Sequence, residues 1–371
     1  MTALAFLVDQ VLSPIPGGMG TYVRQLLPAL QRAEPSLDVT LFHARFEDAR
    51  PEPWMRRFWT EELTQPISRL YPSWIVARRP PLPESLAACD LVHTPLPVAV
   101  PPATRSQRLV VTVHDTAFMV HPHLYPRKWR LLYRAGLARG VRAAAAVLTV
   151  SRHTAEDLSR HTRIDRRKIH VTPLAPALPL TGADANAVLD RLKVPTPFVL
   201  FAGTLEPRKN LVRLVRAYGR VAAGGAPEAL VMAGAMGWNS QSLLREVQIE
   251  APGHVVLTGR VSDDELDALY RTASAFVYPS LYEGFGLPVL DAMARGVPTI
   301  VSTSSSLPEV AGEAAIPVDP RSTGALAEAL SRVLRDRALA DRLRAAGLAR
   351  AAAFSWEETA RLTLEAYKSV L

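Results

Sequence analysis

Short apolar runs separated by longer helical stretches constrain the fold of this chain more than any other feature. The runs are rich in Val, Leu and Ile and lie at residues 4–8, 39–42, 109–113, 146–150, 198–201, 230–233, 255–257 and 275–278. Segments of helical character lie between most of them, and such alternation is typical of parallel α/β sheets. The sequence therefore predicts an α/β protein with parallel strands.

The length of 371 residues is too great for one ordinary core and suits two domains. The alternation of strand and helix is interrupted at residues 172–197, where five prolines gather. We interpret this region as the interdomain connection. The predicted domains are residues 1–180 and 190–353. After them Ser355 is a suitable N-cap for a terminal helix in residues 354–371.

The net charge of +8 lies entirely in residues 1–185, because residues 186–371 carry equal numbers of basic and acidic side chains. A basic half is compatible with nucleic acid, anionic lipid or a phosphorylated ligand, and equally with a merely soluble surface. The single cysteine, Cys89, excludes an intramolecular disulfide and a multi-thiolate metal site. We expect no secretory signal or membrane span, and hence a cytoplasmic protein.

The strongest motif is residues 278–291, YPSLYEGFGLPVLD, where a strand ends, a loop follows and Pro288 opens a helix. Gly284 and Gly286 allow backbone amides to approach a ligand closely, and a helix start offers free N–H groups. Together these features suit a diphosphate. In isolation, Glu283 and Asp291 would be interpreted as solvated surface acids. The glycines between them favour contact with sugar hydroxyls by Glu283 and with ribose hydroxyls by Asp291.

A second strand, glycine turn and helix start occupies residues 201–210, FAGTLEPRKN. Gly203 follows the strand, and Arg208 and Lys209 come at the helix start. Because adjacent parallel strands end on one edge of a sheet, we expect both cations to lie near the first motif. Neutralising a leaving diphosphate is the functional interpretation, and an exposed helix end is the alternative.

The first half contains weaker motifs. Gly17 and Gly18 follow the first strand and precede a helix expected from about Thr21, so they form either a loop that closes over a ligand or a plain turn. His114 and Asp115 end another predicted strand, at the edge where α/β sheets bind ligands. There His114 either contacts a donor-sugar hydroxyl or assists the acceptor, or it is structural.

Two further patterns carry less information. His121 and His123 flank a proline, but without a third ligand we predict no metal site. Basic and aromatic residues interleave at 127–134 and 54–59. Such a stripe suits an anionic membrane or a phosphorylated acceptor. The simpler interpretation is an amphipathic helix with a basic solvent face.

The two main motifs, together with residues 259–266 and 305–312, resemble the retaining glycosyltransferase family 4. The first half agrees more loosely, through Gly17–Gly18, His114–Asp115 and residues 150–151. The resemblance implies the GT-B fold, in which two Rossmann-like domains with parallel sheets face each other across a cleft. It also implies that the second domain holds most of the donor and that the final helix crosses back to the first.

By the same resemblance the catalytic candidates are His114, Arg208, Lys209 and Glu283. The donor-binding candidates are Gly17, Gly18, Gly203, Arg208, Lys209, Glu283, Gly284, Phe285, Gly286, Leu287 and Asp291. No metal and no other cofactor is expected, because the two cations take the metal's place. One departure concerns Asp291, which stands where the family pattern Glu-x7-Glu has a second glutamate. The side chain is one methylene shorter, so its reach to ribose is reduced.

Residues 203–210 with 113–115 look most like the mannosyltransferase-like branch. The resemblance therefore implies a hexosyltransferase that moves mannose from GDP-mannose to a hydroxyl acceptor, lipid-linked or soluble, in glycan biosynthesis. A cytoplasmic enzyme of this kind can lie at the inner face of the membrane. The alternatives are a UDP- or dTDP-sugar donor, a nucleotide-sugar epimerase of the same fold, or a basic nucleic-acid-binding protein. No nucleic-acid motif supports the last, so we expect no nucleic-acid partner.

Overall fold

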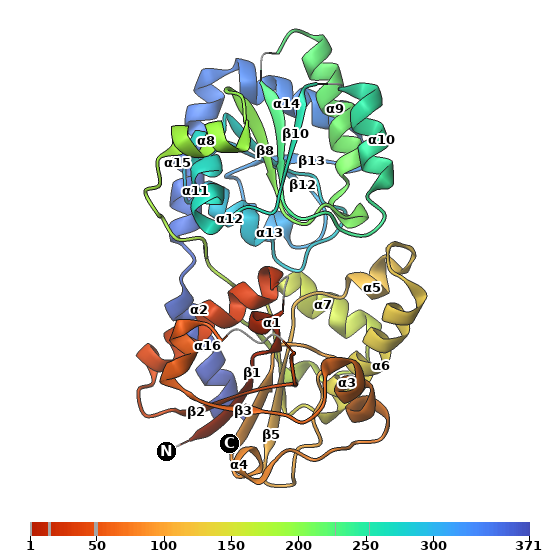
Figure 1. The fold of residues 1–371 in the computed structure, drawn as a ribbon, viewed down its shortest axis with the longest axis vertical. Helices are drawn as coiled ribbons and strands as arrows, with labels where there is room; N and C mark the ends of the chain where they lie inside the picture. The colour runs from red at the N-terminus through yellow and green to blue at the C-terminus, as the bar shows by residue number, and fades with distance from the viewer. Residues whose placement is uncertain (1, 14–15, 48–50, 227, 252) are drawn as a thin grey trace. The chain divides into compact units, whose positions relative to one another are not determined.

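The computed structural model describes residues 2–13, 16–47, 51–226, 228–251 and 253–371. The chain forms two compact units: Met1–Leu174 with Ser355–Leu371, and Ala175–Phe354 (Figure 1). Each unit contains one sheet flanked by helices. All strand pairs among the described residues are parallel, which confirms the predicted α/β class.

The sheet of the first unit has seven strands in the order β3-β2-β1-β4-β5-β6-β7. Their bounds are β1 Ala3–Leu7, β2 Asp38–His43, β3 Trp59–Glu62, β4 Leu91–Thr94, β5 Arg108–Val113, β6 Ala146–Thr149 and β7 Ile169–Val171. Strands β4 and β6 are buried at every residue, as expected for a parallel sheet covered on both faces. The strand order reverses between β1 and β4, and α/β sheets bind ligands beyond the carboxyl ends of strands at such a point.

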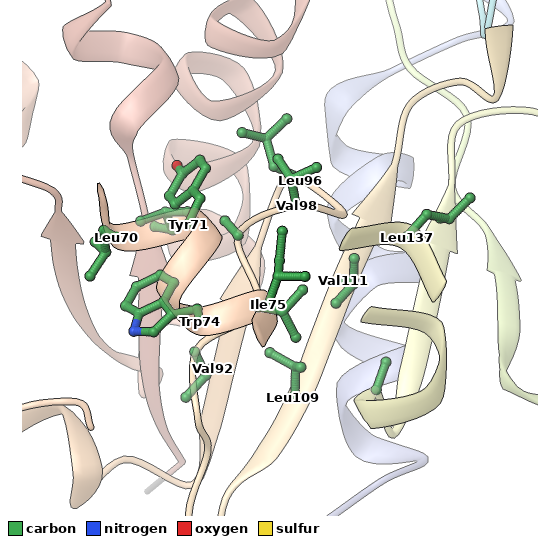
Figure 2. Close-up of a cluster of buried hydrophobic side chains, with 14 of the residues drawn as sticks. Leu70, Tyr71, Trp74, Ile75, Val92, Leu96, Val98, Leu109, Val111 and Leu137 are labelled. Carbon is green, nitrogen blue, oxygen red and sulfur yellow. The ribbon is translucent and has the colours of Figure 1, made fainter. Parts of the chain in front are cut away.

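The α-helices of this unit are α1 Asp9–Leu12, α2 Gly17–Ala33, α3 Ile67–Val76, α4 Glu84–Ala87, α5 Ala117–Val120, α6 Arg127–Ala143, α7 Arg152–His161 and α16 Trp356–Lys368. Short 3₁₀ turns lie at η1 Pro53–Arg57, η2 Pro122–Leu124 and η3 Arg166–Lys168. Figure 2 shows α3 lying on the sheet, with Trp74 and Ile75 packed near Val92 and Leu109 in the buried core.

The start of α2 corrects the predicted helix start near Thr21. The helix begins at Gly17, so Gly17 and Gly18 form its first turn and are not a separate loop. Pro16 has helical dihedral angles at the N-cap, and the amide of Gly20 donates to its carbonyl at 3.0 Å. The fixed φ of proline therefore initiates the helix four residues earlier than predicted.

The last helix, α16, belongs to the first unit. The Ser355 hydroxyl caps it by accepting a hydrogen bond from the amide of Glu358 at 3.1 Å, as predicted for this N-cap. The helix packs against α2 and against the β6 and β7 strands. Its Tyr367 side chain is buried. The chain therefore returns to its first unit after completing the second.

The sheet of the second unit has the order β10-β9-β8-β11-β12-β13. Its strands are β8 Phe198–Ala202, β9 Ala229–Ala233, β10 Val255–Gly259, β11 Ala275–Tyr278, β12 Thr299–Ser302 and β13 Ile316–Val318. Its helices are α8 Ala185–Leu192, η4 Pro207–Lys209, α9 Leu211–Ala223, α10 Gln241–Glu250, α11 Asp263–Thr272, α12 Leu287–Met293, α13 Leu307–Ala311, α14 Thr323–Arg335 and α15 Arg337–Ala352.

The strand order of this second sheet reverses between β8 and β11, which pair directly. The loops after these two strands contain the two main sequence motifs, so the topology brings them to one edge. The loop after β12, which pairs with β11, ends at the same edge. Among the described residues of both units, no helix is long and apolar enough to cross a membrane.

Candidate active site

Glu283 lies between two cations at the edge of the second sheet. Its Oε1 accepts a hydrogen bond from Lys209 Nζ at 2.7 Å, and its Oε2 accepts one from Arg208 Nη1 at 2.9 Å. The cations follow β8 and the carboxylate follows β11, on the two sides of the point where the strand order reverses. The structure thus brings three of the predicted catalytic candidates into direct contact.

Burial and charge act in opposite directions on Glu283. Burial alone would raise the pKa of this carboxyl, but the positive charges of Arg208 and Lys209 outweigh it and lower the pKa to about 2. The side chain is therefore ionised at neutral pH. Burial lowers the pKa of Lys209, and the negative charge of Glu283 opposes that effect. Each partner therefore stabilises the charged form of the other.

Two residues to which the sequence analysis gave no role complete this cluster. Glu206 accepts from Arg208 Nη2 at 2.8 Å, so the two cations are balanced by two carboxylates. The Tyr278 hydroxyl accepts from Lys209 Nζ at 2.6 Å, and the ammonium also lies 4.9 Å from the centroid of the Tyr278 ring. These contacts fix Lys209 in position. The position of Glu206 two residues before Arg208 is the sequence feature from which this ion pair could have been predicted.

Hydrogen bonds join the loops that carry these side chains. Arg208 Nη1 donates to the Tyr282 carbonyl at 2.7 Å, and Asn210 Nδ2 donates to the Pro279 carbonyl at 3.0 Å. Asn210 has a φ of 62°, a left-handed conformation that asparagine tolerates better than most residues. The loop after β8 is thereby tied to the loop after β11.

The predicted loop of Gly284 and Gly286 is braced from the loop after β12. Ser306 Oγ donates to the carbonyls of Glu283 and Phe285, both at 2.9 Å, and Ser305 Oγ accepts from the amide of Glu283 at 2.8 Å. Gly286 is the N-cap of α12, with a φ of 110°. A Cβ there would lie 2.7 Å from Leu307 Cδ2, so a larger residue would have to displace that side chain and would also adopt a backbone conformation that favours glycine. Leu287, the remaining candidate in this loop, is the first residue of the helix.

Asp291 is buried in α12, but its carboxylate contacts the start of the second unit. Oδ1 accepts hydrogen bonds from the amides of Ala177 and Leu178 at 2.9 and 3.0 Å. Burial raises the pKa of Asp291, and the two amide hydrogen bonds oppose this effect. The predicted contact of Asp291 with ribose remains a prediction.

The remaining three glycine candidates, Gly203, Gly17 and Gly18, differ in their surroundings. Gly203 follows β8 with a φ of 141°, a backbone conformation that favours glycine. Gly17 and Gly18 belong to the first unit, where they are exposed at the start of α2.

His114 follows β5 in the first unit and is buried. Burial lowers its pKa to about 4, against a smaller opposing effect of the hydrogen bond that its ring donates to the Pro95 carbonyl. The imidazole is therefore neutral at neutral pH. Among the described residues its buried Nε2 has no hydrogen-bond partner. The Tyr22 ring lies edge-to-face against it, with centroids 4.8 Å apart.

The described residues contain no group of three or more His, Cys, Asp or Glu side chains arranged to hold a metal ion. The rings of His121 and His123 lie with centroids 5.8 Å apart in an edge-to-face contact. The absence of a metal site at these two histidines remains a prediction.

Two family models cover most of the chain. The model described as "Glycosyltransferase Family 4" matches residues 16–175, and the model described as "Glycosyl transferases group 1" matches residues 190–350. The O-antigen chain mannosyltransferase B of Escherichia coli is 34% identical over 270 residues, which are 71% of each chain. The chain belongs to glycosyltransferase family 4. It is therefore a glycosyltransferase, and the predicted family is confirmed.

Other relatives of this family 4 enzyme differ in length. The serotype-specific mannosyltransferase WbdA of Escherichia coli is 30% identical over 286 residues, which are 74% of this chain but only 35% of WbdA. The chain thus spans about a third of WbdA.

Solved structures show the fold of the family 4 chain. The sucrose-phosphate synthase of Thermosynechococcus elongatus superposes with a TM-score of 0.77 at 23% identity, over 100% of this chain and 99% of that one. Anabaena Alr3699/HepE in complex with UDP-glucose superposes with a TM-score of 0.76 at 16% identity, over 100% of both chains. The predicted GT-B fold is confirmed.

Proposed function

We propose that this family 4 enzyme transfers mannose from GDP-mannose to a hydroxyl of a growing glycan, with retention of anomeric configuration and without a metal ion. The cluster of Arg208, Lys209 and Glu283 at the edge of the second sheet is the observation that carries the proposal. The mannose assignment is supported by relatives named as mannosyltransferases. The GDP assignment rests on the resemblance of residues 203–210 and 113–115 to that branch.

In this proposal Arg208 and Lys209 stabilise the departing diphosphate. An ammonium has three protons, and the described partners of Lys209 Nζ are Glu283 and Tyr278, so one donor is left for a phosphate oxygen. Both cations are preorganised by buried partners and need little rearrangement when charge develops on the leaving group. Supplying two fixed positive charges is the task that a divalent metal performs in other phosphate sites.

Glu283 contacts the transferred sugar, and the backbone around Phe285, Gly286 and Leu287 holds sugar and phosphate. Each oxygen of the Glu283 carboxylate accepts one hydrogen bond from a cation and has a further lone pair for a sugar hydroxyl. The bond between the anomeric carbon and the phosphate oxygen breaks as the acceptor oxygen attacks from the same face. The departing phosphate oxygen takes the acceptor proton, so no protein base is required.

His114 serves as a hydrogen-bond acceptor for a sugar hydroxyl. Its ring donates to the Pro95 carbonyl, which fixes the tautomer and leaves Nε2 as an acceptor. A buried acceptor without a partner among the described residues is costly, and a hydroxyl bound there would remove that cost. The low pKa keeps the ring neutral throughout the physiological range.

The acceptor is a lipid-linked glycan, and the enzyme works in the cytoplasm at the inner face of an anionic membrane. Residues 116–155 contain seven Lys and Arg side chains and no Asp or Glu. On α6, Trp129 and Leu131 are 52% and 67% exposed, among the exposed cations Arg127, Lys128 and Arg134. This combination suits anionic lipid. Sedimentation of the protein with anionic vesicles but not with neutral vesicles supports the assignment. A protein that stays in the supernatant with both kinds of vesicle contradicts it.

Thermal-shift measurements with a panel of nucleotides and nucleotide sugars test the donor assignment, because a ligand that binds the native state raises the melting temperature. Selective stabilisation by GDP and GDP-mannose is expected. Stabilisation by uridine or thymidine nucleotides alone would overturn the GDP assignment. Conversion of the donor to an epimer without acceptor would indicate an epimerase, and steeply salt-dependent binding to random duplex DNA would indicate a nucleic-acid-binding protein.

A further inference from the structure

Glu206 is a buried acid that contacts the cation pair of the candidate site and has no task in the proposed transfer. Its Oε1 accepts hydrogen bonds from Arg208 Nε at 3.0 Å and from Arg208 Nη2 at 2.8 Å. The side chains of Glu206 and Arg208 expose only 6% and 13% of their surface, so solvent screens this pair weakly. A carboxylate thus holds one of the two cations to which we assign the diphosphate.

The backbone fixes the position of Glu206 independently of its ion pair. The amide of Leu205 donates to the Ala235 carbonyl at 2.9 Å, and the amide of Gly237 donates to the Leu205 carbonyl at 3.0 Å. Gly237 also packs closely on the acid, since a Cβ on this glycine would lie 3.0 Å from Glu206 Cβ. The loop after β9 therefore holds Glu206 beside Arg208 without any contribution from a ligand.

The formal charges of the four ionic side chains in the cluster cancel. Arg208 and Lys209 supply two positive charges, and Glu206 and Glu283 supply two negative charges. Buried cations without counter-charges are costly, so this balance stabilises the site when it holds no ligand. A diphosphate brings several further negative charges. The cluster with its ligand then contains more negative charge than its two cations neutralise.

The two carboxylates of the cluster differ in what they offer the donor. Glu283 pairs with both cations and, in the proposed reaction, contacts the transferred sugar. Glu206 occupies two donor groups of Arg208 that also suit a phosphate oxygen. An anion bound by Arg208 must take these donors from Glu206 or lie close to its negative charge. Like charges about 6 Å apart in a poorly solvated site alter an affinity by about tenfold or more.

We infer that Glu206 is a counter-charge that competes with the diphosphate for Arg208 and thereby weakens binding of the nucleoside diphosphate that remains after transfer. In the ligand-free enzyme it keeps Arg208 in place, and after transfer it favours release of the product. The inference rests on the proposed function, since it requires a diphosphate at Arg208 and Lys209. A residue that only held Arg208 in place would strengthen nucleotide binding, so the two roles predict opposite effects.

Calorimetric titration of GDP into the wild type and into Glu206→Gln tests the inference by the sign of the change. The amide keeps the shape of the side chain and an oxygen that accepts from Arg208, but it removes the negative charge. We expect Glu206→Gln to bind GDP about tenfold more tightly than the wild type. Weaker or unchanged binding overturns the inference.

Three further variants identify the charge as the cause. Glu206→Ala also removes the charge and should also bind GDP more tightly, so it decides the question if the glutamine variant does not fold. Glu206→Asp keeps the charge and should bind GDP as the wild type does. Glu313→Gln removes an exposed acid of the same unit and should leave the affinity unchanged. Equally tight binding by the aspartate variant or by the Glu313 variant would contradict the inference.

Melting temperatures give a second readout on the same proteins. Without ligand, Glu206→Gln should melt below the wild type, because buried Arg208 loses a counter-charge. Saturating GDP should then raise its melting temperature by more than it raises that of the wild type. An equal or smaller rise contradicts the inference.

Inorganic pyrophosphate repeats both measurements without a base, which separates failure of the inference from failure of the proposed function. If the wild type binds pyrophosphate but not GDP, the GDP assignment fails and the pyrophosphate series tests the inference. If the wild type binds neither, the proposed diphosphate site and the inference both fail. If the wild type binds and the variants without the charge bind no more tightly, the inference alone fails.

Discussion

Lys209 Nζ lies 2.7 Å from Glu283 Oε1, and both side chains are buried. The two residues are 74 positions apart in the sequence, and they meet because β8 and β11 are neighbours in the sheet. Both charged groups are therefore fixed in position and orientation before any ligand binds. Lys209 is therefore the residue whose removal should affect transfer most.

Lys209→Ala should lower turnover by a factor on the order of a hundred or more, as expected for the loss of a preorganised charge at a leaving group. Steady-state release of nucleoside diphosphate in the presence of an accepted glycan measures this effect. Arg220→Ala, which removes an exposed cation in the last turn of α9, is the control and should leave turnover unchanged. Unchanged turnover in the Lys209 variant would refute its assignment to leaving-group stabilisation.

Glu283 should make the stability of the protein depend on acid pH. Its pKa in the folded protein, about 2, lies below its ordinary value of 4.5. The ionised carboxylate therefore stabilises the fold fully above pH 4.5, by about 3 kcal/mol, and this contribution is lost as the pH falls toward 2.

Urea denaturation of the wild type and of Glu283→Gln at pH 7, 5, 4 and 3 measures this dependence. The difference in free energy of unfolding should shrink as the pH falls. Glu328→Gln, at an exposed position of α14, should follow the wild type at every pH. Parallel profiles for the wild type and Glu283→Gln would show that the carboxylate is not stabilised by its cations.

His114→Ala should lower the kcat/KM for transfer about two- to tenfold, since one hydrogen bond to the sugar is lost. The affinity for free GDP, which has no sugar to transfer, should stay unchanged. Calorimetry with GDP and initial rates with GDP-mannose separate the two effects. An equal loss of GDP affinity would place the role of His114 at the nucleotide. Because the pKa of His114 is about 4, its titration should produce no inflection in the rate between pH 6 and 8.

Tyr367→Phe should lower the free energy of unfolding by about 1–3 kcal/mol, because it leaves a buried nitrogen of His93 unpaired. His93 Nδ1 lies 2.5 Å from the Tyr367 hydroxyl, and its Nε2 lies 2.7 Å from Thr112 Oγ1. The combination of Tyr367→Phe and Thr112→Val should cost less than the sum of the single changes, since the residues belong to one network. Additive costs in denaturant titrations would mean that the network is not coupled.

Most of the sheet architecture was predictable because buried parallel strands are apolar along their whole length. All eight predicted runs contain strands of the structure. Among the described residues five strands were not predicted: β3, β4, β7, β12 and β13. Strand β3, with the sequence WTEE, is polar and lies at the edge of its sheet, and β7 and β13 have only three residues. Strands β4 and β12 are buried but have only four residues, polar ones among them. Such strands form because a neighbour pairs with them, which periodicity does not reveal.

Some residues of the candidate site were likewise predictable from the sequence, and others were not. Gly203, Arg208, Lys209 and Glu283 were recognisable because strand, glycine turn and helix start are local patterns. Ser305 and Ser306, which hydrogen-bond to the Glu283 loop, lie in the loop after β12. From the sequence they had no role beyond membership of a stretch that resembles family 4. The contact of Asp291 with residues 177 and 178 spans more than a hundred positions, so no local pattern predicts it. The only related signal in the sequence is that Asp291 is one methylene shorter than the glutamate of the family pattern.

Binding of the donor nucleotide to Arg208 and Lys209 is the central claim, and calorimetric titration of GDP in the presence of EDTA tests it most directly. The wild type should bind GDP without a divalent metal, and the variant carrying Arg208→Ala and Lys209→Ala should bind it at least about a hundredfold more weakly. Equal affinity of the two proteins, or binding that appears only after magnesium or manganese is added, would contradict the account.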